Sequence, residues 1–133
     1  GSLNSSLVVR DNAYIGSNSA APTSGLGVAG ETKLTGLNTA ITTKTADYTA
    51  LTTDHTILVD ATSNNVTITL PTAVGNSRLY TIKRIDGSVN TVTIATTSSQ
   101  TIDGSTTYTG LLTQYQTVAV QSNSSHYFIT SKF

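Results

Sequence analysis

The sequence contains no cysteine, methionine or tryptophan, and only two of its 133 residues are proline. Without cysteine there is neither a disulfide framework nor a thiolate metal site, and catalysis by a cysteine nucleophile is excluded. Charge is also scarce, because 11% of the residues are charged and seven Lys and Arg balance seven Asp and Glu. A nucleic-acid-binding surface needs clustered basic residues, so we expect no DNA or RNA partner.

Long apolar runs are missing too. No stretch approaches the roughly 18 residues of a membrane span, and the start has no basic region followed by an apolar one, so we expect no membrane insertion. Gly1-Ser2 is typical of a cleavage scar left by protein expression, and we exclude residues 1–2 from the fold. Together with the missing Met, this scar indicates a segment cut from a longer protein.

Hydroxyl side chains are abundant and charged ones are few: the sequence contains 27 Thr and 16 Ser. Threonine is β-branched and its restricted χ1 favours strands over helices. No stretch combines helical periodicity with capping residues. The composition therefore predicts an all-β protein, and the length allows about one compact domain.

The N-terminal part contains a weak internal repeat. Residues 7–16 are followed by a similar stretch at residues 26–36, with matching apolar pairs at Val9/Val28 and Ile15/Leu34. Each unit is a short β-hairpin around a polar turn. A single hairpin is marginal because nothing covers its apolar face. We therefore predict that residues 3–40 form a shaft of short β-hairpin repeats, in which hairpins from several chains pack together.

From about Ile41 onward, apolar and polar residues alternate more sharply. We expect strands at residues 56–60, 66–70, 79–85, 91–95, 115–121 and 127–131, with shorter ones near Tyr48 and Tyr108. Turn residues such as Asp86-Gly87 and Asp103-Gly104 separate them. This spacing predicts an antiparallel, jelly-roll-like β-sandwich as a head domain over residues 41–133.

The order of the motifs in this head carries a resemblance. The motifs, in chain order, are Thr45-Ala46-Asp47-Tyr48-Thr49, Ile57-Leu58-Val59-Asp60-Ala61-Thr62, Val66-Thr67-Ile68-Thr69-Leu70-Pro71, Tyr80-Thr81-Ile82-Lys83-Arg84-Ile85-Asp86, Asn90-Thr91-Val92-Thr93-Ile94, Ile102-Asp103-Gly104 and Tyr127-Phe128-Ile129. Over about residues 43–133 this order resembles a β-sandwich module common in bacteriophage tail-fibre and appendage proteins. The N-terminal hairpins are similar to trimeric fibre-shaft repeats of the Val-x-Gly-Asn-x-x-Ile-Gly type, although Arg10-Asp11 and Ala29-Gly30-Glu31 stand where those repeats carry Gly-Asn.

The resemblance implies a homotrimeric fibre segment on the outside of a virion, with a head on a thin stalk. Our leading hypothesis is a structural, non-enzymatic segment of a phage tail fibre or appendage that contributes to attachment to a host cell-surface glycan or protein receptor. The alternative is a monomeric carbohydrate-binding β-sandwich from a secreted bacterial enzyme or adhesin.

Candidate residues for the trimer interface come from both parts of the chain. They are Val9, Val28, Leu34, Lys83 and Arg84. Lys83 and Arg84 lie on opposite faces of one strand, so one of them points inward. If the chain forms a trimer, we expect one of the two to pair across a subunit boundary with Asp60 or Asp86, because a half-buried charge needs a partner. The alternative is an exposed charge that only keeps the protein soluble.

No residue is predicted to be catalytic, and no metal or cofactor is expected. His55 and His126 lack the context of a Ser-His-Asp triad and fall at strand starts, and Asp86 and Asp103 precede glycines in turns. Among the tyrosines, Tyr80, Tyr115 and Tyr127 fall within strands and are expected in the core or a subunit interface. Tyr14 and Tyr108 lie near turns and are the candidates for stacking on a sugar.

Overall fold

A computed structural model describes residues 35–133, and the residues from Asn38 to Phe133 form one compact unit made of strands and loops. The all-β prediction is therefore confirmed for this part of the chain. The predicted hairpin repeats up to residue 34, with Val9, Tyr14, Val28 and Leu34, lie outside the described residues. In residues 35–133 no helix has the length and apolarity needed to cross a membrane.

Nine strands are found within the described residues. They are β1 (Ile41–Lys44), β2 (Tyr48–Thr49), β3 (Thr56–Val59), β4 (Val66–Thr69), β5 (Leu79–Arg84), β6 (Val92–Ala95), β7 (Thr107–Tyr108), β8 (Thr117–Ser122) and β9 (Tyr127–Lys132). Every strand expected from the sequence is present to within a few residues. Strand β1 was not among those expected.

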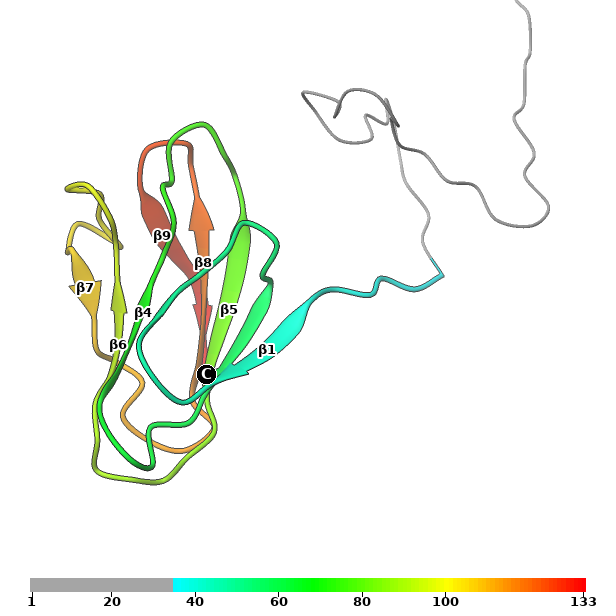
Figure 1. Cartoon of the computed structure of the whole chain (residues 1–133). Helices are drawn as coiled ribbons and strands as arrows, with labels where there is room; N and C mark the ends of the chain where they lie inside the picture. The colour runs from blue at the N-terminus through cyan, green and yellow to red at the C-terminus, as the bar shows by residue number, and fades with distance from the viewer. Residues whose placement is uncertain (1–34) are drawn as a thin grey trace, which may run out of the picture. The chain divides into compact units, whose positions relative to one another are not determined.

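The strands form two sheets that pack as two layers (Figure 1). One sheet has five strands in the order β1-β3-β5-β8-β9, and the other has four in the order β2-β4-β6-β7. From β1 to β6 the chain alternates between the sheets, so it winds through three coils, β1/β2, β3/β4 and β5/β6. Successive coils pair in parallel, whereas β7, β8 and β9 add in antiparallel fashion.

The prediction of an antiparallel, jelly-roll-like sandwich is thus wrong in its strand pairing, although two packed sheets are found. Alternating apolar and polar residues usually indicate antiparallel strands, because most parallel sheets are covered on both faces. In this chain, the returning half of each coil covers only the inner face of the sheet. Thr67 and Thr69 on β4 remain on the outer face, so parallel strands acquire the alternating pattern.

The core lies between the sheets. It is filled by inward-facing β-branched and aliphatic side chains with no exposed surface, among them Ile57, Val59, Ile68, Ile82, Ile94 and Val120. Two aromatic rings complete it: Tyr80 and Tyr127 pack edge to face, with centroids 6.2 Å apart. Their hydroxyls donate to the carbonyls of Leu51 and Pro71, so the buried phenols have partners. The core placement predicted for these two tyrosines is confirmed.

Tyr115 lies outside the strand predicted for it and outside the core. Its φ of 68° places the backbone in the left-handed region, strand β8 begins only at Thr117, and 61% of Tyr115 is exposed. The preceding loop is held by Gln116, whose Oε1 accepts the amides of Leu112 and Thr113. This local contact turns the chain before the strand can start.

Candidate functional site

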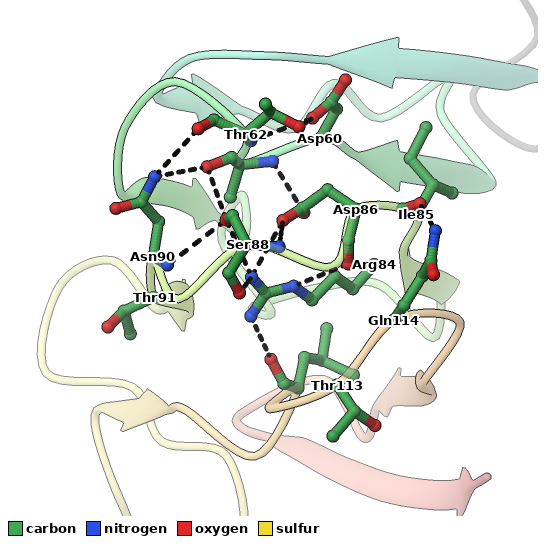
Figure 2. A network of polar contacts seen from close by, with 12 residues as sticks. Asp60, Thr62, Arg84, Ile85, Asp86, Ser88, Asn90, Thr91, Thr113 and Gln114 are labelled. Carbon is green, nitrogen blue, oxygen red and sulfur yellow. Dashed lines mark hydrogen bonds and ion pairs between the residues drawn. The ribbon is translucent and has the colours of Figure 1, made fainter.

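A buried polar network joins the second and third coils at the corner where β3 and β5 end (Figure 2). At its centre, Arg84 is the last residue of β5 and faces inward in the register of the buried Val59. Its Nη2 lies 2.9 Å from Oδ1 of Asp86, and the two side chains are 2% and 3% exposed. This is the one salt bridge found among the described residues.

The remaining donors of Arg84 are also used. Nε donates to the carbonyl of Asp86, Nη1 to that of Leu111, and Nη2 also reaches Ser88. A buried guanidinium is tolerated only when it is paired and hydrogen-bonded in this way. The expected pairing of Arg84 with Asp86 therefore occurs, but within one chain and not across a subunit boundary.

The carboxylate of Asp86 accepts two backbone amides in addition to the guanidinium of Arg84. Its Oδ2 accepts the amide of Ala61 at 2.8 Å, and its Oδ1 accepts the amide of Ser88. Burial acts to raise the pKa of Asp86, but the hydrogen bonds from Arg84, Ser88 and Ala61 outweigh it and hold that pKa well below its usual range. The carboxylate is thus charged at neutral pH, and it does more than form the turn predicted for Asp86-Gly87.

The same pattern recurs at other corners of the coil. Asp47 accepts the amide of Thr67 in the next coil, and Asn65 likewise accepts the amide of Thr91. Asn90 donates back to the carbonyl of Ala61. No buried side-chain nitrogen or oxygen in the described part of the chain lacks a partner. The buried polar side chains of the network are therefore all hydrogen-bonded, and their contacts fasten one coil to the next.

The two histidines do not form a catalytic constellation with the acids. His55 and His126 immediately precede β3 and β9, as expected, and their Nδ1 atoms contact Thr56 and Thr101. Neither imidazole has a carboxylate partner in residues 35–133. No group of three His, Cys, Asp or Glu side chains that could hold a metal ion is found there either.

A small pocket of about 100 Å³ opens between β7 and β9, the edge strands of the two sheets. Tyr108 from β7 and Lys132 from β9 line it, together with Gln116, Thr117 and Phe133. Tyr108 pairs with the buried Ile94 and Lys132 with the buried Val118, so both side chains belong to the inner side of their sheets. The sandwich is open here because the strands β7 and β9 do not pair.

Gly110 leaves room for the Tyr108 ring. A Cβ atom at residue 110 would overlap the hydroxyl and ring atoms of Tyr108. Hence only glycine lets the ring lie against the backbone of the loop that follows β7. Of the two tyrosines predicted to contact a ligand, Tyr108 lies in a pocket, and Tyr14 falls outside the described residues.

The two sheets differ in their outer faces. The outer face of the four-stranded sheet carries small residues, namely Thr49, Thr67, Thr69, Thr93, Ala95 and Thr107. The outer face of the five-stranded sheet carries larger apolar side chains among its threonines, namely Ile41, Leu58, Leu79 and Phe128. Ile41 is 65% exposed and Phe128 is 45% exposed. Large exposed apolar patches are typical of interaction surfaces, and this face is the candidate for one.

Lys83 is the charged residue on that apolar outer face. Its Nζ donates to the carbonyl of Tyr115 at 2.9 Å and lies 5.6 Å from the centroid of the Tyr115 ring. A second donor reaches the hydroxyl of Thr117. These contacts replace part of the hydration that the ammonium would lose if the face were covered. Lys83 thus points outward and Arg84 inward, as expected for neighbours on one strand.

Comparison with models of known protein families gives no match, and comparison with curated proteins finds no significant relative.

Proposed function

We propose that this chain is a structural, non-enzymatic segment of a homotrimeric phage tail fibre or appendage, exposed on the outside of the virion, and that it contributes to host attachment. The observation that carries the trimer is the outer face of the five-stranded sheet. Three copies of this sheet around a common axis would cover Ile41, Leu79 and Phe128, which otherwise lie in water at a cost in free energy.

The sheet edges support association through this face. β1 is a free edge of the five-stranded sheet, but it is short and its Lys44 belongs to the inner register, with Nζ 3.7 Å from the centroid of the Tyr48 ring. A short edge strand with an inward-pointing lysine resists the addition of another strand. At the opposite edge, the ladder that joins β9 to β8 has a register shift at the step from Ala119 to Val120. Edge-to-edge assembly is therefore disfavoured.

The mass of the chain in solution tests the proposal. We expect light scattering after size exclusion to give three times the mass of one chain, unchanged on dilution. A stable monomer would contradict the trimer. It would favour the alternative, a monomeric carbohydrate-binding sandwich, for which the pocket at Tyr108 is the supporting observation.

A further inference from the structure

The geometry points to a binding site for a carboxylate-bearing sugar, such as a uronic acid residue of a polysaccharide, in the pocket lined by Tyr108, Gln116 and Lys132. This inference rests on the attachment role in the proposed function and names the chemical class of ligand that would be bound. Because the pocket lies at the open side of a single sandwich, binding to it is measurable whatever the oligomeric state.

The charge of the pocket favours an anion. Its lining residues include Lys132 and no residue with an acidic side chain. Within residues 35–133, Lys132 has no ion-pair partner, since the single salt bridge joins Arg84 and Asp86. A carboxylate that entered the pocket would therefore meet a lysine that forms no ion pair in this part of the chain, and a hydrogen bond between two charged groups is among the strongest available.

The neutral polar groups add donors beside that charge. Gln116 uses its Oε1 to accept the amides of Leu112 and Thr113, at 2.6 and 2.9 Å, so its Nε2 is the atom with unused hydrogen-bonding capacity. The hydroxyl of Tyr108 makes no hydrogen bond among the described residues. Hydroxyl and amide donors of this kind suit the ring and hydroxyl oxygens of a sugar.

Two aromatic rings distinguish a sugar from a simple anion. Tyr108 and Phe133 both line the pocket, and an aromatic ring packs against the apolar C–H face of a pyranose. Gly110 allows this position of the Tyr108 ring, because a side chain there would displace it. With a volume of about 100 Å³, well below that of drug-sized sites, the pocket accepts one end of one sugar residue.

The test is a titration of the isotope-labelled chain with methyl β-D-glucuronide, monitored by NMR through the amide chemical shifts. Methyl β-D-glucoside is the uncharged match, and acetate is the anion without a sugar ring. We expect the glucuronide to shift resonances of Tyr108, Gln116 and Lys132, with a dissociation constant at least about tenfold below those of glucoside and acetate, as for one added charge-assisted contact.

Three variants locate the site. Lys132→Gln is expected to weaken glucuronide binding about tenfold and to leave the weak glucoside binding unchanged. Gly110→Ala is expected to weaken both by displacing Tyr108. Arg78→Gln is the control, because Arg78 is also an exposed cation but lies just before the opposite end of β5, outside the pocket.

Several results would overturn the inference. Equal affinity for glucuronide and glucoside would show that Lys132 does not select for a carboxylate. Equal affinity for glucuronide and acetate would show an anion site that does not recognise the sugar ring. Shifts confined to other residues, or no shifts at millimolar sugar, would exclude the pocket as the site. Each of these results is separate from the mass measurement, so the sugar site and the trimer can fail independently.

Discussion

The carboxylate of Asp86 links two coils of the chain: its Oδ1 pairs with Arg84 of the third coil, and its Oδ2 accepts the amide of Ala61, which follows β3 in the second. Neither contact is available to any other acid in Figure 2, where Asp60 instead binds the neighbouring Thr62. The two aspartates of this network therefore differ in role: Asp86 connects two coils, whereas Asp60 holds a local turn.

We expect Asp86→Asn to lower the free energy of unfolding by about 3–5 kcal/mol, because it leaves the buried guanidinium of Arg84 without a counter-charge. Urea denaturation followed by circular dichroism measures the change. Asp60→Asn is the matched control and is expected to cost less than about 1 kcal/mol, since it affects a local turn at a half-buried position. Equal losses in the two variants would contradict the assigned role of Asp86.

The low pKa of Asp86 predicts how stability depends on pH. The pKa is lower in the folded chain than the value of about 3.9 in an unfolded one. The resulting stabilisation is fully present above the unfolded pKa and is lost as the pH falls toward the folded one. Below about pH 4 we expect the urea concentration at the unfolding midpoint to fall. Through this group, the free energy of unfolding should decrease by up to about 1.4 kcal/mol per pH unit. In Asp86→Asn this part of the slope should disappear, and a wild-type slope in the variant would argue against Asp86 as its source.

The strands of the head were predictable because each buries one face. Ile82 and Ile68 alternate with threonine or lysine along β5 and β4. Such a period-two pattern indicates a β-strand with one buried face. Strand direction is a different matter, because the same pattern fits parallel and antiparallel neighbours. The sequence does contain a trace of the coil: Asp47, Asn65 and Asn90 stand at successive corners, where each hydrogen-bonds to the neighbouring coil.

The polar sites were predictable only in part. The sequence showed that either Lys83 or Arg84 must face inward, and it named Asp86 as a possible partner, but not that the pair would form within one chain two residues apart. Tyr108 was singled out for lying near a turn, whereas Lys132 and Gln116 were missed. They reach the same pocket because β7 and β9 are the free edges of two different sheets, and that proximity depends on the strand order.

The turn at Asp103-Gly104 gives a test of local backbone geometry. Asp103 and Gly104 have φ values of 47° and 88°, and the flanking Ile102 and Ser105 exchange two hydrogen bonds, as in a tight hairpin that needs positive φ at both central residues. We expect Gly104→Ala to cost about 1 kcal/mol in unfolding free energy. Gly36→Ala is the control, since no positive φ is recorded there and the space around it is also open. Equal stability of the two variants would contradict the strained backbone at residue 104.

The outer face of the five-stranded sheet gives the sharpest test of the trimer. Leu79 and Phe128 both neighbour Gln121 across β8, and both point outward, so Leu79→Lys with Phe128→Lys should leave the fold of one chain intact. Burying one Leu or Phe is worth about 1.5–3 kcal/mol, so losing both and adding charge should weaken association by about 100-fold or more. Light scattering at two concentrations should then report a monomer, with circular dichroism unchanged. Val89→Lys is the control, because Val89 is 101% exposed in the loop between β5 and β6, and it should remain trimeric. A double variant that stays trimeric would move the interface away from this face, toward the N-terminal repeats.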